Sequence, residues 1–427
     1  MKNQKPSIKE TTLAIPTYLL GPEDKNPHFS HVIDKPVYPY SMLDEITTVK
    51  KSKNYRAIVM ENSFIKLIIL PDLGGRIYSI YDKTINQEVL YKNHVIKPSL
   101  IALRGAWISA GIEFNYFFFG HSVTTISPVD YAISSEDDKC TLTIGGVDKI
   151  YQMKWAVSIT LYSDKSYIEI GIKLFNTSQF RYPNYFWTNV GLPATRDMQF
   201  ICPTKEIMMS WCSGGIQYPV YESKDMSWYK NHEYAVDLYG SLSTEDYFGA
   251  YYHKNDYGLI HIAKHKDCPG KKFFTWGNNP QGHAWTKILT DHAGPYVEIQ
   301  SGRFMTQHEQ EFIRPFSTES WKEHWYVLKG LGGVSYANSK AAFNITAEKK
   351  GSDLKIKVKI NTTSAVAGAI LNVKSKGKII YTFSADLKPE QVFMKNIAIP
   401  KNKTGKELIL ELIDSKGECL AEYKKEI

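Results

Sequence analysis

The segment PYVEIQSGR, residues 295–303, alternates polar and apolar side chains. As a β-strand it would place Glu298 and Gln300 on one face and Val297 and Ile299 on the other, because strand side chains point alternately to opposite faces. If the apolar pair faces a core, the carboxylate faces the other way, toward a cleft where it could transfer protons. An ordinary solvent-facing glutamate fits the same pattern. We take Glu298 as the first catalytic candidate.

A second carboxylate lies in the largely apolar segment GIEFNYFFFGHS, residues 111–122. A carboxylate in such surroundings must be paired or must have a raised pKa, and a raised pKa keeps a general acid protonated near neutrality. His121, directly after Gly120, adds another group that could donate or accept protons. The alternatives are that Glu113 only ties down a loop and that His121 is structural. Glu113 and His121 complete the set of catalytic candidates.

Rings and polar groups that could bind a sugar recur in the same parts of the chain. Aromatic rings cover the apolar faces of sugars, and amide or guanidinium groups bind their hydroxyls. Arg76 follows the glycine pair of LPDLGGR and could offer a planar fork of donors to hydroxyls or a carboxylate. The candidates for substrate binding are Arg76, Asn115, Trp187, Asn189, Gln300, Arg303 and Trp285.

The elements that must position these residues are short β-strands. The chain has 427 residues, of which 43% are hydrophobic and 22% charged, so it can bury a large core. Many short segments alternate apolar and polar residues at period two, and Gly, Pro, Asn and Asp residues separate these segments. No amphipathic helix longer than about two turns is expected. Because strands and helices do not alternate, we predict a large antiparallel β-sandwich rather than a parallel sheet.

The composition changes near residues 335–342. All nine tryptophans precede this point, and the stretch LGGVSYANSK at 331–340 is typical of a linker with few contacts across it. The segments that follow alternate at period two, which predicts a small immunoglobulin-like β-sandwich. We therefore expect a large β-domain over 1–335, with the candidate carbohydrate site, and a small accessory domain over 341–427.

Charge and motifs exclude several classes of function. The net charge of +8 comes mostly from residues 341–427, where lysines without arginines follow the pattern of an exposed strand face, so no nucleic-acid partner is expected. No apolar run reaches the roughly 18 residues of a membrane span, so no membrane partner is expected. The five scattered cysteines suggest neither disulfides nor zinc, and no phosphate loop, dinucleotide fingerprint or HExxH motif occurs. We expect no cofactor or metal, and a cytoplasmic location unless a leader was removed.

Taken together, the motifs resemble those of the galactose-mutarotase-like superfamily of β-supersandwich proteins. Within it, the chain is most similar to a bacterial family of unknown function whose members are often fused to tetratricopeptide repeats. The resemblance is carried by IPTYLLGPEDKNP (15–27), LPDLGGRIYSIYDK (70–83), NHVIKPSLIALRGAWISAGIEFN (93–115), YFWTNVGLP (185–193), PGKKFFTWG (269–277), LTDHAGPYVEIQSGR (289–303) and WKEHWY (321–326).

The resemblance implies a reaction at an anomeric centre. In mutarotases a late-strand glutamate takes the proton from the anomeric hydroxyl, and this role carries over onto Glu298. The mutarotase histidine does not carry over, because the matching strand reads YFWTN and offers Asn189, so His121 would have to substitute for it. The leading hypothesis is glycoside hydrolysis by the pair Glu298 and Glu113, which needs one acid and one base or nucleophile.

Two alternatives stay open, an aldose 1-epimerase with Glu298 as base and a histidine acid, and a non-catalytic carbohydrate-binding protein. The expected partner is a mono- or oligosaccharide. The sugar, its linkage, the stereochemical outcome and the oligomeric state are left open by the sequence.

Overall fold

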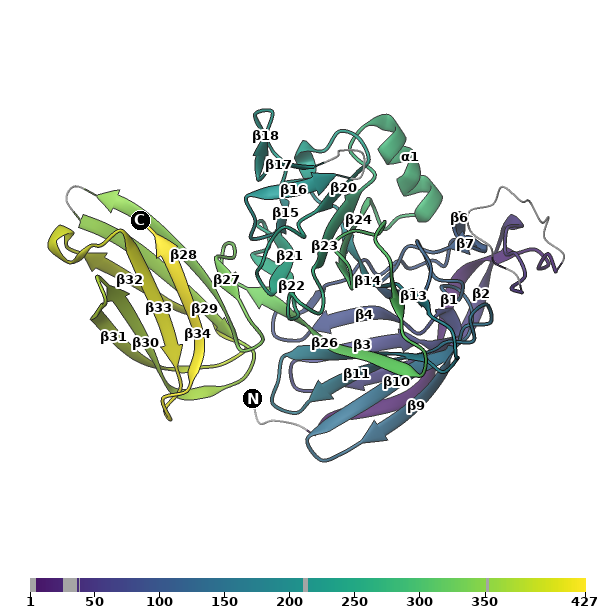
Figure 1. Ribbon diagram of the computed structural model, residues 1–427, viewed down its shortest axis with the longest axis horizontal. Helices are drawn as coiled ribbons and strands as arrows, with labels where there is room; N and C mark the ends of the chain where they lie inside the picture. The colour runs from purple at the N-terminus through teal and green to yellow at the C-terminus, as the bar shows by residue number, and fades with distance from the viewer. Residues whose placement is uncertain (1–4, 26–36, 38, 210–213, 351–352) are drawn as a thin grey trace.

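The computed structural model of the chain describes residues 5–25, 37, 39–209, 214–350 and 353–427. Figure 1 shows a large body built from the N-terminal and central parts of the chain and a smaller one from the C-terminal part. The predicted all-β fold, a large antiparallel sandwich followed by a small β-sandwich, is confirmed. Asn26 and Pro27 of the N-terminal motif, and Cys212, lie outside the described residues.

The first sheet of the large body contains the strands that were selected for chemistry. Its order is β1 (Ser7–Leu20), β2 (Ile46–Glu61), β3 (Ile65–Leu70), β4 (Arg76–Asp82), β8 (Ile112–Tyr116), β14 (Phe186–Pro193), β24 (Tyr296–Gly302), β23 (Gly270–Thr275), β20 (Val236–Tyr239), β16 (Glu206–Met209) and β17 (Gly215–Gln217), with β5 (Gln87–Glu88) paired to β4. The neighbouring strands in the centre of this sheet pair antiparallel. They come from segments that are far apart in the sequence.

The second sheet packs against the first across one apolar core. Its order is β15 (Met198–Ile201), β21 (Tyr247–Tyr252), β22 (Tyr257–Ile262), β26 (Ser317–Lys329), β12 (Tyr167–Asn176), β11 (Lys154–Tyr162), β10 (Lys139–Val147) and β9 (Asp130–Ser135). Ile112, Val190 and Ile299 of the first sheet meet Ile170 and Trp325 of the second in this core. The polar residues that alternate with the first three therefore lie on the opposite face.

That opposite face is covered by protein rather than by solvent. All seven residues of β24 are buried. Trp107 and Leu289 form an apolar cluster with Tyr296 over one end of the strand. Trp107 belongs to β7 (Gly105–Trp107), which pairs with β6 (Ser99–Ala102). An ordinary solvent-facing position for Glu298 is thus ruled out, since only 4% of this residue is exposed.

Leu289 belongs to α1 (Pro280–Leu289), a helix of 10 residues that the sequence did not predict. Asn279 caps it, because its side chain accepts a hydrogen bond of 2.8 Å from the Gly282 backbone N–H. Pro280 occupies the first turn, where its missing N–H costs nothing. The Asn-Pro pair is a helix start signal, but the short helix has too few periodic apolar residues to show it.

The remaining short elements of the described chain are β13 (Tyr182–Asn184) paired with β25 (Glu311–Ile313), β18 (Val220–Tyr221) paired with β19 (Lys224–Asp225), and the 3-10 helices η1 (Pro71–Leu73), η2 (Tyr229–Asn231) and η3 (Lys401–Lys403). Within the described ranges, no helix has the length and apolar character needed to cross a bilayer.

The small body consists of two four-stranded sheets with a separate core. One sheet is β27 (Tyr336–Ala337), β28 (Ala341–Lys350), β29 (Asp353–Thr362) and β32 (Phe393–Ile399), and the other is β31 (Lys378–Leu387), β30 (Val366–Ser375), β33 (Glu407–Ile413) and β34 (Cys419–Glu426). On β29, Ile356 and Val358 are buried while Lys355 and Lys357 are exposed. The lysine pattern is thus that of a solvated strand face.

The stretch 331–340 is not the sparsely bonded linker that its composition suggests. Leu331 and Ala337 are buried in an apolar cluster that joins the two bodies. The Tyr326 hydroxyl donates a hydrogen bond of 2.9 Å to the carbonyl of Asn338. The two bodies therefore share a packed seam, and the division at 335–341 stays a prediction.

We predict that Gly302→Ala destabilises the protein. A Cβ at Gly302 would lie 2.4 Å from ring atoms of Trp187, which is fully buried and cannot move aside. Overpacking of this kind costs about 1–3 kcal/mol, so the urea midpoint should fall clearly. Gly171→Ala on β12 is the control, because its Cβ would make only an ordinary contact of 3.8 Å with Ser158. Equal stability of Gly302→Ala and the parent would contradict this packing.

Candidate functional site

The strand register brings the sequence-selected residues together on one face of the first sheet. Asn189 on β14 lies opposite Glu113 on β8 and opposite Gln300 on β24. Gln300 in turn lies opposite Lys272 on β23. Glu298 lies two residues before Gln300 on the same face of β24. Since neighbouring strands are about 4.8 Å apart, these residues form a compact polar row across four strands.

A pocket of about 220 Å³ opens over this row. Its lining residues are Ile101, Trp107, Asn115, Phe119, Gly120, His121, Asn189, Asp237, Lys272, Phe274, Trp276, Glu298, Gln300 and Gln307. Five of the residues selected from the sequence, Asn115, His121, Asn189, Glu298 and Gln300, are among them. The strands thus bring these five selected residues to one pocket.

Glu298 is held by two donors from its own strand. The Tyr296 hydroxyl donates to its Oε1 at 3.0 Å and the Gln300 Nε2 donates to its Oε2 at 2.6 Å. Burial, followed by the charge of Glu298, raises the pKa of Tyr296 well above its usual range, so this hydroxyl stays a donor. The carboxylate is fixed in orientation at the wall of the pocket, as a proton acceptor requires.

Glu113 lies behind the lining and is surrounded by donors. These are Arg76 Nη2 at 3.0 Å, Trp107 Nε1 at 3.0 Å, Thr125 Oγ1 at 2.7 Å, Asn115 Nδ2 at 3.2 Å, Asn189 Nδ2 at 3.1 Å and the Nδ1 of His121. Burial alone would raise the pKa of Glu113. The charge and hydrogen bond of His121 and the charge of Arg76 outweigh burial and hold the pKa well below its usual range.

The expectation that Glu113 is a protonated general acid is therefore wrong. The apolar run of sequence around it suggested a raised pKa, but Arg76 and His121 reach it from other segments and keep it ionised. A carboxylate with all its acceptor positions occupied by protein donors cannot also serve a ligand. Of the alternatives that the sequence left open, the paired carboxylate is the one that the structure contains.

His121 faces the pocket on a loop that Glu113 and Asn115 hold in place. Its Nδ1 contacts Glu113 Oε1, and the Ser122 backbone N–H donates to Asn115 Oδ1 at 2.7 Å. An ionised carboxylate only accepts, so Nδ1 carries a hydrogen and Nε2 is left for proton exchange. No described residue is recorded with a hydrogen bond to Nε2. The ring packs on Trp107 with centroids 4.7 Å apart.

An ion pair from β23 and β20 also lines the pocket. Lys272 Nζ lies 2.6 Å from Asp237 Oδ1 and donates to Gln307 Oε1 at 2.6 Å. Burial is the largest single influence and lowers the pKa of Lys272, but the charge and hydrogen bond of Asp237 together with the charges of Tyr239 and Glu298 raise it overall, so the amine stays charged. The sequence did not single out these residues. The segment KFFTW alternates from Lys272 to Phe274 and Trp276 and could have been found by the period that found Glu298, whereas Gln307 lies in a loop without such a signal.

Besides Glu113, four selected residues do not line the pocket. Arg76 pairs with Glu113. Trp187 packs beneath the lining against Tyr185 and Tyr239. Arg303 turns away, because it pairs with Glu319 at 3.1 Å. Trp285 stacks on Trp276 with centroids 3.9 Å apart and lines a different groove.

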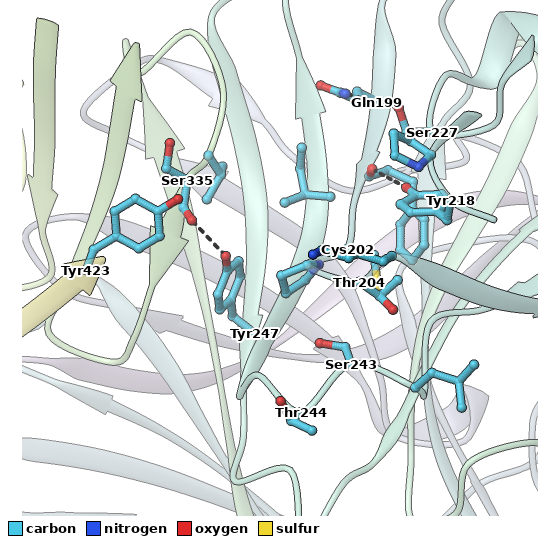
Figure 2. Close-up of a pocket in the computed structure, with 17 residues that line it drawn as sticks. Gln199, Cys202, Thr204, Tyr218, Ser227, Ser243, Thr244, Tyr247, Ser335 and Tyr423 are labelled. Carbon is cyan, nitrogen blue, oxygen red and sulfur yellow. Dashed lines mark hydrogen bonds between the residues drawn. The ribbon is translucent and has the colours of Figure 1, made fainter. Parts of the chain in front are cut away.

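Figure 2 shows a larger cavity of about 630 Å³ at the seam between the two bodies. Tyr247 and Tyr423 line it, and the Tyr247 hydroxyl donates to the carbonyl of Ser335 at 2.9 Å. None of the ten selected residues lies there. Its volume alone is no reason to prefer it to the smaller pocket, which is lined by the Glu298 carboxylate, the His121 ring and the Asn189 amide. Among the described residues, no group of three or more His, Cys, Asp or Glu side chains is arranged to hold a metal ion.

The large body is thus an antiparallel β-sandwich with a polar pocket on the outer face of one sheet. Residues 33–327 match the family described as "Domain of unknown function (DUF5107)", and the chain belongs to this family. Residues 336–423 match the family described as "YphG-like protein, second domain". The family resemblance drawn from the sequence motifs is thereby confirmed.

Solved structures with similar folds include a TPR-domain containing protein from Parabacteroides distasonis, with 27% identity and a TM-score of 0.69. The match covers 76% of this chain and 56% of that one, so this chain spans little more than half of its length. A galactose mutarotase-like protein from Clostridium acetobutylicum has 10% identity and a TM-score of 0.48, over 64% of this chain and 96% of that one. One from Lactobacillus casei has 10% identity and a TM-score of 0.46, over 64% and 99%.

We predict that Glu113→Gln destabilises the fold strongly. It leaves the buried Arg76 without its counter-ion, and removing one partner of a buried pair costs about 3–5 kcal/mol. Glu319→Gln is the matched control, since the partly exposed pair with Arg303 is worth about 0–1 kcal/mol. Urea unfolding of both variants at pH 7 measures the difference, and equal losses would contradict the assigned charge state.

The same pair predicts a pH dependence. Because the folded-state pKa of Glu113 lies below the unfolded value of about 4.3, its stabilising contribution is complete above that value and is lost as the pH falls below it. The free energy of unfolding of the parent should therefore decrease from about pH 5 downward. In Glu113→Gln this decrease should be shallower. Parallel curves would contradict the lowered pKa.

Proposed function

We propose that the protein interconverts the anomers of a free monosaccharide, with Glu298 as the base and His121 as the acid. The observation that carries this proposal is that the Glu298 carboxylate and the His121 ring line one pocket, each held by a separate hydrogen-bond network. Two proton-transfer groups at one small site are what ring opening and closure of a sugar need.

The protons and bonds balance as follows. Glu298 takes the proton of the anomeric hydroxyl while His121, protonated at Nε2, gives a proton to the ring oxygen. The bond from C1 to the ring oxygen breaks and C1 becomes an aldehyde carbonyl. After rotation about the bond from C1 to C2, His121 takes the proton back from the attacking hydroxyl and Glu298 returns its proton to the carbonyl oxygen. Glu113 accepts the Nδ1 hydrogen throughout and stabilises the imidazolium whenever Nε2 is protonated.

Glycoside hydrolysis by a pair of glutamates receives less support. It needs two carboxyl groups at the scissile bond, but Glu113 is enclosed by six donors and ionised. The other carboxylate in the pocket, Asp237, is paired with Lys272. The pocket has a volume of about 220 Å³, whereas sites for drug-sized ligands have volumes of about 300–1,000 Å³. The smaller volume favours a single sugar ring.

Polar atoms of the lining support a saccharide as ligand. Asn189 is 1% exposed, and no described residue donates to its Oδ1. Its Nδ2 is used on Glu113, so the remaining position can only accept a hydrogen bond. The indole N–H of Trp276 is likewise buried without an acceptor among the described residues. A sugar hydroxyl can donate to the first and accept from the second, and Phe274 offers an apolar surface for the ring.

We expect Glu298→Gln and His121→Asn each to slow anomer interconversion by about 10²–10⁴, because each removes a proton-transfer group. The assay is polarimetry, or exchange NMR of the two anomers, with a panel of aldoses. His308→Asn is the matched control, since His308 stacks on Phe119 at 5.3 Å but does not line the pocket. It should keep the parent rate.

Other outcomes separate the alternatives. If the parent binds sugars without accelerating their exchange, the protein is a carbohydrate-binding module and the proposal fails. Release of the aryl group from an activated glycoside, abolished in Glu298→Gln, would instead support hydrolysis.

A further inference from the structure

A continuous series of hydrogen bonds leads to Glu298 from Lys272 on the neighbouring strand β23. Lys272 Nζ donates to Gln307 Oε1 at 2.6 Å. Gln307 Nε2 donates to Gln300 Oε1 at 3.0 Å, and Gln300 Nε2 donates to Glu298 Oε2 at 2.6 Å. All four residues are buried. An ammonium and a carboxylate are thus connected through two amides from different segments.

The chemistry of the end groups fixes the direction of the chain. An ammonium only donates, so the oxygen of Gln307 must face Lys272 and its NH₂ must face Gln300. An ionised carboxylate only accepts, which turns the NH₂ of Gln300 toward Glu298. Both amides are therefore held in one orientation, with every donor pointing toward Glu298. Bonds aligned in this way polarise one another, so the chain is stronger than separate bonds.

We propose that Gln307 and Lys272 are positioning residues that hold Gln300, and through it the Glu298 carboxylate, in the orientation that the base needs. This inference rests on the proposed function, because it assigns to the chain the task of preparing Glu298 for proton transfer. Neither residue has to touch the reacting atoms. They act through Gln300, because of these three residues only Gln300 contacts the Glu298 carboxylate.

Several other charged or titratable groups lie in the pocket of Glu298 or beneath it. They are Tyr296 on its own strand, Lys272 and Asp237 on β23 and β20, Arg76 and Glu113 on β4 and β8, and His121 on the loop. Arg76 and Glu113 neutralise each other, as do Lys272 and Asp237. Besides the Tyr296 hydroxyl, the Gln300 amide at the end of the hydrogen-bonded series donates to the Glu298 carboxylate, and it adds no net charge to the pocket.

The test is the pKa of Glu298, measured by the ¹³C shift of its side-chain carboxyl and identified by the signal missing in Glu298→Gln. Gln307→Leu breaks the chain in the middle, and we expect it to raise this pKa by about one unit. Lys272→Met removes the start of the chain and should shift the pKa in the same direction. The matched control is Gln199→Leu, because Gln199 also bridges two side chains, Ser227 and His253, but at the seam cavity (Figure 2).

An unchanged Glu298 pKa in both Gln307→Leu and Lys272→Met would overturn the proposal, and Gln307 would then be structural only. If Gln307→Leu does not fold, Gln307→Glu keeps the size and the acceptor but loses the donor, and it too should raise the pKa. Because the titration needs no turnover, it separates this inference from the proposed function. If the parent shows no anomer exchange, the proposed function fails. If the pKa of Glu298 is unshifted in the variants, the positioning role of Gln307 and Lys272 fails.

In an active parent, the acid limb of the pH profile of kcat/KM should move with the same pKa. A structural defect alone would lower the rate without moving that limb. A profile that keeps its midpoint in Gln307→Leu while the rate falls would therefore also contradict the proposal.

Discussion

The site depends on one buried charge. Glu113 lies beneath the pocket as an anion, and the fold supplies Arg76 to neutralise it and five further groups to occupy its oxygens. A buried carboxylate without these partners would cost several kcal/mol. The same partners fix Asn115, Asn189 and His121, which line the pocket. The constraint that makes Glu113 tolerable in the interior thereby also orients the groups that a ligand would meet.

The large sheet makes this arrangement possible because adjacent strands come from distant parts of the chain. Glu113, Asn189, Gln300 and Lys272 follow one another across four strands in register. Their polar side chains share the face away from the apolar core, and β7 and α1 cover one end of it. Two networks result, one centred on Glu113 and one running from Lys272 to Glu298. In our account the first prepares the acid and the second prepares the base.

The alternation of side chains along a strand was sufficient to predict the all-β fold and the face of β24 that carries Glu298 and Gln300. It could not predict what each charged group meets, because Arg76, His121 and Asn189 reach Glu113 through tertiary pairing. For the same reason the sequence could not show that Arg303 pairs with Glu319 or that Trp285 stacks on Trp276, and Gln307, which a loop brings to Gln300, left no pattern in the sequence. The packing of residues 331–340 between the two bodies was not predicted, because small polar residues are typical of a buried turn as well as of a linker.

The central claim is that Glu298 and His121 act on opposite sides of one anomeric centre while Glu113 supports His121 from behind. A crystal structure of Glu298→Gln with a bound monosaccharide tests it most directly. The account predicts the anomeric hydroxyl within hydrogen-bond distance of residue 298 and the ring oxygen within that distance of His121 Nε2. A sugar whose anomeric carbon points away from residue 298, or one bound only at the seam cavity, would contradict it.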